Sequence, residues 1–215
     1  IEEYLCGESL YARIERTGSL QTGELIRLGI ELCRIMNYLH SFKPNPILYL
    51  DLHPGNLLIC REQLKLIDFD QAALASLSQE RSVCYGTKGF AAPEQYEGGT
   101  LDERTDIYAI GALLYYMGTG HAPEGEIKAG QGSCRGDLYI LMGRCLRIEK
   151  KERCQSVREV LEALEKLEAR IFAERHIPLL RIAAAGSRSG IGVTHTALGA
   201  VRYLRQKGVS CLYRE

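Results

Sequence analysis

Two short stretches constrain this chain more than any others: residues 48–59 read LYLDLHPGNLLI, and residues 64–70 read LKLIDFD. In the first, Asp51 lies inside an apolar run, a Pro54-Gly55 turn pair follows, and a second apolar run begins after Asn56. Turn residues between two apolar runs predict a strand, a loop and a strand. The loop then carries the polar side chains, and Asp68 follows the next apolar run.

Phosphoryl transfer requires this set of groups: a carboxylate to hold the attacking hydroxyl, and an amide with a second carboxylate to hold Mg²⁺ against the phosphates. Asp51, Asn56 and Asp68 supply them. Ordinary turn acids would account for either carboxylate alone, but they account poorly for both carboxylates with Asn56 at this spacing.

The same residues resemble the eukaryotic-like, bacterial-type serine/threonine protein kinases, whose catalytic loop runs Asp, Leu, Lys, Pro, any residue, Asn, before a strand and Asp-Phe-Gly. The resemblance implies that Asp51 orients or deprotonates the substrate hydroxyl, and that Asn56 and Asp68 are magnesium ligands. His53 stands at the lysine position. Taken alone, the stretch resembles equally the aminoglycoside and choline phosphotransferases, which share the kinase-like fold but phosphorylate small molecules.

Three residues depart from the kinase pattern. His53 replaces a lysine with an imidazole, which carries less charge at neutral pH but can still donate a hydrogen bond. Leu50 replaces the arginine that pairs with a phosphate on the activation segment in many kinases, which disfavours control by phosphorylation there. Asp70 replaces the glycine after Phe69, and Phe69 is expected to pack inward.

The segment 85–96, YGTKGFAAPEQY, separates the two families. Gly-Thr followed by Ala-Pro-Glu resembles the end of a protein-kinase activation segment, which forms the shelf for a peptide substrate. The resemblance places Thr87 near Asp51, where it helps to select Ser/Thr substrates. A protein substrate is therefore expected rather than a small molecule.

Residues 1–10, IEEYLCGESL, resemble the hinge between the two kinase lobes. By that resemblance the Glu3 carbonyl and the Leu5 amide face the adenine of ATP, Ser9 lies near the ribose, and Leu58 forms the apolar floor under adenine. A plain loop that enters a helix is the alternative for this segment.

Helical patterns follow on both sides of the catalytic loop. The first covers Thr22 to Ser41 with Thr22 as its N-cap, and the charged-then-apolar run 101–120 predicts an enclosed helix. Two further helices are expected, over Asp137–Arg147 and after Ser156, which has a capping-box spacing with Glu159. The kinase resemblance implies that Asp106 holds the catalytic-loop backbone and that Glu94 and Arg153 form a buried ion pair.

From residue 176 the pattern changes to strand, loop, helix, strand. The loop GSRSGIGVT resembles the phosphate-binding loop of ParA/MinD-type ATPases, with Arg188 at the signature lysine and Thr194 at the magnesium threonine. Val193 occupies the place of the loop lysine, so nucleotide hydrolysis is not favoured. A mere tight turn explains the glycines as well.

Composition excludes several other classes of protein. The 215 residues include 27 basic and 27 acidic side chains, so nothing favours nucleic acid as a partner. Eight cysteines without a Cys-x-x-Cys spacing are typical of buried thiols in a reducing cytoplasm. The longest apolar run, Ile107–Met117, is about half of a membrane span.

The sequence therefore predicts an α+β, protein-kinase-like fold: a hinge and a mainly helical C-lobe over residues 1–175, followed by a partial α/β segment over 176–215. The expected activity is transfer of the γ-phosphate of ATP to protein Ser/Thr hydroxyls with Mg²⁺, in the cytoplasm, with possible coupling to the fused ATPase-like segment. We interpret the chain as a fragment without an N-lobe, inactive by itself. A pseudokinase that binds nucleotide or a partner is the alternative, and a small-molecule phosphotransferase is the third.

Overall fold

The structure is a computed structural model, and it describes residues 6–77, 86–124 and 136–175. The chain divides after Arg175 into two units. The expected ParA/MinD-like segment, with Arg188, Val193 and Thr194, lies outside the described residues.

The first unit is mixed but mostly helical, as the sequence predicts. Its helices are α1 (Leu10–Thr17), α2 (Thr22–His40), α3 (Pro93–Glu97), α4 (Glu103–Thr119), α5 (Gly136–Cys145) and α6 (Val157–Arg175). Its strands are β1 (Glu8–Ser9), β2 (Ile47–Leu48), β3 (Leu57–Cys60), β4 (Gln63–Leu66) and β5 (Ala73–Leu74), and 3₁₀ turns cover Pro54–Asn56 and Lys150–Glu152.

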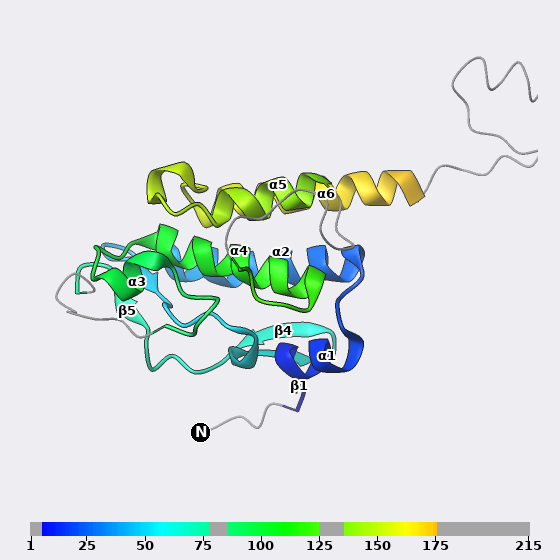
Figure 1. Cartoon of the computed structure of the whole chain (residues 1–215), viewed down its shortest axis with the longest axis horizontal. Helices are drawn as coiled ribbons and strands as arrows, with labels where there is room; N and C mark the ends of the chain where they lie inside the picture. Colours follow the sequence, from blue (N-terminus) through cyan, green and yellow to red (C-terminus); the bar gives the residue numbers. More distant parts are fainter. Residues whose placement is uncertain (1–5, 78–85, 125–135, 176–215) are drawn as a thin grey trace, which may run out of the picture. The chain divides into compact units, whose positions relative to one another are not determined.

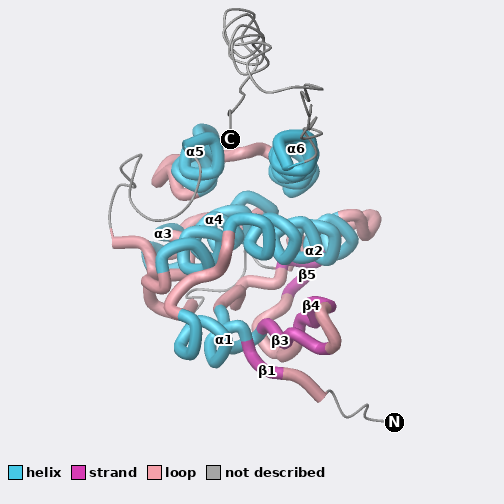
Figure 2. The backbone as a smooth tube through the Cα atoms, turned by 90° about the vertical axis from the view of Figure 1, so that its right-hand side faces the viewer, coloured by secondary structure: helices cyan, strands magenta, loops and turns pink. Residues whose placement is uncertain are grey.

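The elements form three levels. The small antiparallel sheet β1-β3-β4 and α1 lie at one end, α2 and α4 cross the middle, and α5 and α6 cover the other end (Figures 1 and 2). Strands β2 and β5 form a separate antiparallel pair. The catalytic loop, residues 49–56, runs between β2 and β3.

The core follows the apolar stripes that the sequence shows. Helix α2 buries residues on several turns, including Leu25, Leu32 and Met36, and α4 is buried on almost every face. At the start of α6, the Ser156 hydroxyl accepts the Glu159 N–H at 3.2 Å, and the Glu159 carboxylate accepts the Gln155 N–H at 2.8 Å. The capping interaction predicted for Ser156 and Glu159 is therefore present, with the carboxylate displaced by one residue.

Two expected helix boundaries are wrong by small amounts. Thr22 is the first helical residue of α2, and Gln21 is the N-cap without a side-chain capping bond. Helix α5 ends at Cys145 rather than at Arg147. A threonine at the first helical position satisfies the sequence pattern equally well, because boundaries shift by one or two residues without changing the apolar stripe.

Glycine at position 29 allows α2 to approach two other helices. A Cβ atom there would lie 2.7 Å from Leu114 Cδ2 on α4 and 3.2 Å from Leu164 Cδ1 on α6. Because the core is close-packed, these leucines can move only by disturbing their own neighbours. Gly29 therefore lies where α2 closely approaches both α4 and α6.

We expect Gly29→Val to lower the free energy of unfolding by about 1–3 kcal/mol, because it overpacks this crossing. Gly143→Val is the matched control, since a Cβ at Gly143 in α5 meets nothing within 4 Å. Urea denaturation of the two variants would test the difference. Equal unfolding free energies would show that the crossing relaxes without cost.

Among the described residues, none of the helices has both the length and the apolar character needed to span a bilayer.

Candidate active site

A buried carboxylate, that of Asp106, binds the backbone at the start of the catalytic loop. Asp106, which is 1% exposed near the start of α4, accepts the Tyr49 N–H at 2.9 Å and the Leu50 N–H at 2.8 Å. It also contacts His40 Nε2 at 2.8 Å. The backbone contact predicted for Asp106 is confirmed, and it fixes the chain just before Asp51.

Three polar residues meet at Asp51. The Thr87 hydroxyl donates to Asp51 Oδ1 at 3.0 Å, although the two residues are 36 positions apart. The Asn56 amide donates to the Asp51 carbonyl at 3.2 Å and to Asp51 Oδ2 at 3.4 Å. His53 Nε2 lies 3.8 Å from Asp51 Oδ2. The structure thus brings together Asp51, His53, Asn56 and Thr87.

His53 has a defined orientation. Its Nδ1 atom accepts the Gly55 backbone N–H at 3.1 Å. A backbone N–H can only donate, so Nδ1 carries no proton in this arrangement and the neutral ring carries its proton on Nε2. His53 therefore presents an N–H donor beside Asp51, in the place where a lysine would present a charge.

The β3–β4 hairpin brings Asn56 close to Asp68 along the backbone. Leu57 pairs with Leu66, and the Ile67 N–H donates to the Asn56 carbonyl at 3.0 Å, which extends the ladder by one step. The side-chain amide nitrogen of Asn56 donates to Asp51. The side-chain oxygen Oδ1 of Asn56 is therefore the atom available to a cation. Asp68 follows Ile67 directly.

This donor set fits Mg²⁺. One amide oxygen and one carboxylate are hard ligands, and Mg²⁺ is usually held by one or two carboxylates with phosphates and water completing the octahedron. No cluster of three or more His, Cys, Asp and Glu side chains in the described ranges is placed to hold a metal ion. Two protein ligands would leave the other positions of the octahedron to phosphate oxygens and water.

Phe69 differs from the expectation. It is 47% exposed instead of packed inward, and its ring forms a T-shaped pair with that of Tyr49, at 5.2 Å between centroids. The Tyr49 hydroxyl donates to the Ile67 carbonyl. Burial raises the pKa of Tyr49 above its usual value, and the Asp51 carboxylate adds to the effect, so the hydroxyl remains a neutral donor.

Asp70 fits its position without strain at its own backbone. The left-handed conformation falls on Asp68, with φ of 60°, and the Asp70 N–H donates to Asp68 Oδ1 at 3.2 Å. Asp is one of the few side chains that tolerate a left-handed conformation, because its short polar group bonds nearby backbone. The Asp-Phe-Asp sequence therefore forms a local turn.

Leu50, which stands where many kinases have an arginine, is buried among apolar side chains. It is 3% exposed and packs in a small cluster with Leu48 and Leu101. A buried leucine cannot pair with a phosphate, so the expectation that this position lacks a partner for activation-segment phosphorylation has a structural basis.

Four residues are expected to contact the nucleotide, and two of them lie opposite each other on adjacent strands. Ser9 on β1 pairs with Leu58 on β3 in the antiparallel register. The Ser9 hydroxyl also accepts the Ala12 N–H at 3.1 Å as the N-cap of α1. The other two, Glu3 and Leu5, lie outside the described residues.

The segment 86–93 leads into α3 and is anchored by a buried ion pair. Glu94 and Arg153 form two parallel bonds, Nη1–Oε1 at 2.7 Å and Nη2–Oε2 at 2.8 Å, as the resemblance predicts. Beside this anchor lies a pocket of about 580 Å³. It is lined by residues of the segment and of α3 and α4: Gly86, Lys88, Gly89, Ala91, Pro93, Tyr96, Glu97 and Tyr108.

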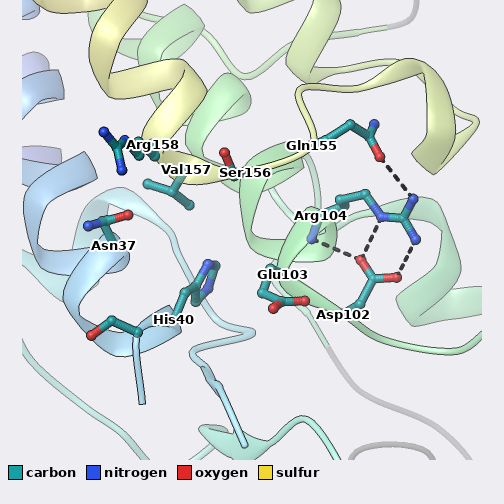
Figure 3. A pocket seen from close by; sticks show the side chains of 10 residues that line it. Asn37, His40, Asp102, Glu103, Arg104, Gln155, Ser156, Val157 and Arg158 are labelled. Atoms are coloured by element: carbon teal, nitrogen blue, oxygen red, sulfur yellow. Dashed lines mark hydrogen bonds and ion pairs between the residues drawn. The ribbon is translucent and has the colours of Figure 1, made fainter. Parts of the chain in front are cut away.

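A second pocket, of about 500 Å³, lies between the end of α2 and the starts of α4 and α6 (Figure 3). Arg104 lies between Asp102 and Gln155 in its wall, and hydrogen bonds join it to both. Burial would raise the pKa of Asp102, but the bonds from Arg104 and Lys150 outweigh it and hold that pKa well below its usual range. In the wall of this pocket, Asp102 is thus paired with Arg104 and Lys150.

Sequence reasoning missed Gln95. This residue is 2% exposed, and its side chain joins α3 to the catalytic loop by a bond to the Leu50 carbonyl at 2.8 Å. The only sequence signal is its place directly after Ala-Pro-Glu, because its partner lies 45 residues away. The contact between His40 and Asp106, 66 residues apart, was missed for the same reason.

Comparisons with known proteins agree with this geometry. The family model for the protein kinase domain matches residues 1–176. Integrin-linked protein kinase 1 of Arabidopsis thaliana is 30% identical over 203 residues, which cover 88% of this chain and 42% of that protein. Serine/threonine-protein kinase A of Synechocystis is 29% identical over 80% of this chain and 39% of its own length.

A probable serine/threonine-protein kinase of Clostridium acetobutylicum is 25% identical over 78% of this chain and 28% of its own length. The chain thus spans less than half the length of these curated relatives. Because the family model covers most of the 215 residues, the chain belongs to the protein kinase domain family.

Proposed function

We propose that this chain supplies the catalytic C-lobe of a serine/threonine protein kinase that transfers the γ-phosphate of ATP to protein hydroxyls. The observation that carries the proposal is the Thr87–Asp51 hydrogen bond of 3.0 Å. It places the segment before Ala-Pro-Glu, which resembles the peptide shelf of protein kinases, directly against the acid that would receive the substrate hydroxyl.

Each residue has a role in this proposal. Asp51 orients the acceptor hydroxyl and takes its proton, and His53 donates from Nε2 to the transferring phosphate. Asn56 and Asp68 hold Mg²⁺, which neutralises charge on the phosphates when bound. Glu3, Leu5 and Leu58 receive the adenine, and Ser9 the ribose.

The substrate shelf, residues 86–93, would receive the acceptor protein. Its pocket of about 580 Å³ combines the aromatic side chains Tyr96 and Tyr108 with the charged Lys88 and Glu97. A pocket that combines aromatic and charged side chains suits an extended protein segment better than a single small polar molecule. Coupling of this lobe to residues 176–215 and a cytoplasmic location belong to the same proposal.

The second candidate is a pseudokinase that binds nucleotide or a partner. It is supported by His53, whose ring is held by Gly55 as a neutral donor where the family has a lysine. It is supported also by buried Leu50. The presence of Asp51, Asn56 and Asp68 together favours catalysis, because a binding module requires no such set.

Transfer from γ-labelled ATP tests the proposal in the full-length protein, with magnesium varied and a generic basic protein as acceptor. We expect label on Ser or Thr, and none on aminoglycosides or choline. Bound ATP without transfer would favour the pseudokinase, and labelled small molecules would favour the third alternative.

Thr87 variants test whether the shelf and Asp51 act together. Thr87→Val removes the hydroxyl at nearly constant volume, and a hydrogen bond to a charged group is worth about 1.5–3 kcal/mol, so kcat/KM for the protein substrate should fall roughly 10–100-fold. Thr87→Ser keeps the donor and should keep most of the activity. A valine variant as active as the wild type would contradict a role for this contact.

A further inference from the structure

The residue just before Asp51 has an unusual backbone conformation. Leu50 has φ of 67°, in the left-handed region that leucine rarely adopts. Such a conformation persists only where the surroundings hold it. Because Leu50 precedes Asp51 directly, the direction of the Asp51 side chain depends on whatever holds this peptide.

Two buried side chains hold it, one from each side. The Asp106 carboxylate accepts the Leu50 N–H at 2.8 Å. The Gln95 amide donates from Nε2 to the Leu50 carbonyl, also at 2.8 Å. Gln95 and Asp106 are 2% and 1% exposed, so water does not compete for either bond.

The other end of the Gln95 amide is used as well. Its Oε1 atom accepts the Ala92 N–H at 3.0 Å. A backbone N–H must donate and a carbonyl must accept, so the two partners fix which end of the amide is oxygen and which is nitrogen. Ala92 is the N-cap of α3 and the residue before Pro93. Gln95 therefore joins the end of the substrate shelf to the peptide that precedes Asp51.

The start of the same shelf also lies against Gln95. A Cβ atom on Gly86 would be 3.1 Å from Gln95 Nε2. The next residue, Thr87, donates to Asp51 itself. Asp51 is thus tied to the shelf twice: directly through Thr87, and through the Leu50 peptide by Gln95.

We infer that Gln95 is a positioning residue, which holds the left-handed Leu50 peptide and sets the substrate shelf in register with Asp51. An amide is the group that this position requires, because it offers one donor and one acceptor at a fixed separation. A carboxylate would keep the Ala92 bond but would place an acceptor against the Leu50 carbonyl. The inference rests on the proposed function, since it assigns a part of that site.

The test compares two variants. Gln95→Met keeps the length of the side chain but loses both hydrogen bonds, and Gln95→Glu loses only the donor to the Leu50 carbonyl. Steady-state kinetics of the full-length protein should show kcat about tenfold lower in both variants, as for the loss of a buried hydrogen bond, with KM for ATP unchanged. Gln155→Met is the matched control, because Gln155 also donates to backbone carbonyls, including that of Arg153 at 2.7 Å, on the loop before α6. Its kcat should equal that of the wild type.

Hydrogen–deuterium exchange of the segment 49–52 gives a readout that does not need activity. Faster exchange there in Gln95→Met, but not in Gln155→Met, would support the inference even if the wild type transferred no phosphate and the proposed function failed. Three results would overturn the inference. They are a wild-type exchange rate for that segment in Gln95→Met, a kcat within twofold of wild type, or a kcat loss fully explained by a smaller folded fraction in thermal melts.

Discussion

Replacement of Asp51 by asparagine is expected to lower phosphate transfer by about 10²–10⁴-fold, the range for loss of a positioned general base. The change keeps the volume of the side chain but removes its charge and its ability to take a proton. Oδ1 of Asp51 accepts the Thr87 hydroxyl at 3.0 Å, and Oδ2 faces the Asn56 amide at 3.4 Å. An asparagine with its amide oxygen at the Oδ2 position keeps the Asn56 bond, and the Thr87 hydroxyl can accept from its amide nitrogen, so the loop should keep its order.

The measurement is the rate of label transfer from γ-labelled ATP in the full-length protein, with nucleotide binding followed separately. We expect binding to persist in the variant, because none of the proposed adenine or magnesium contacts is removed. Asp137→Asn is the matched control: Asp137 lies on α5, where it pairs with exposed Arg170. An Asp51→Asn variant that transfers phosphate at the wild-type rate would remove Asp51 from the mechanism.

Replacement of Arg153 by methionine is expected to lower the free energy of unfolding by about 3–5 kcal/mol, because it leaves the partner charge buried and unpaired. Arg153 is 1% exposed. Besides its two bonds to Glu94, it donates to three backbone carbonyls, those of Arg147 at 2.7 Å and of Arg104 and Ile148 at 2.9 Å. Its guanidinium also lies 5.0 Å from the Tyr108 ring.

Urea denaturation of the full chain measures this effect, and Arg170→Met supplies the control. Arg170 forms an ion pair with Asp137 on the exposed surface, where such pairs contribute at most about 1 kcal/mol. The double variant Arg153→Met with Glu94→Leu should be more stable than Arg153→Met alone, since no unpaired charge remains. A loss below about 1 kcal/mol in Arg153→Met would show that water reaches Glu94 and replaces the arginine.

The kinase fold could be predicted because its signals are local and occur in order. The apolar stripes of α2 and α6 depend on residues three and four positions apart, the apolar run of α4 is nearly continuous, and the capping of α6 depends on Ser156 and Glu159. The polar residues of the site are also close in sequence. Asp51 and Asn56 lie in one loop, and the register of the β3–β4 hairpin then brings Asp68 near Asn56. The Glu94–Arg153 pair spans 59 residues and was predicted only through the family resemblance.

The sequence by itself determined the order of elements and the identity of the polar groups at the site. The tertiary structure alone decided how these groups are held: the left-handed peptide at Leu50, the Gln95 bridge, the His40–Asp106 contact and the exposure of Phe69. The physical reason is that a periodic pattern reports which face of an element is buried, whereas a buried polar side chain takes its partner from whatever backbone group the fold brings to it. Gln95 could have bonded any unpaired carbonyl, and only the packing of α3 against the catalytic loop selected that of Leu50.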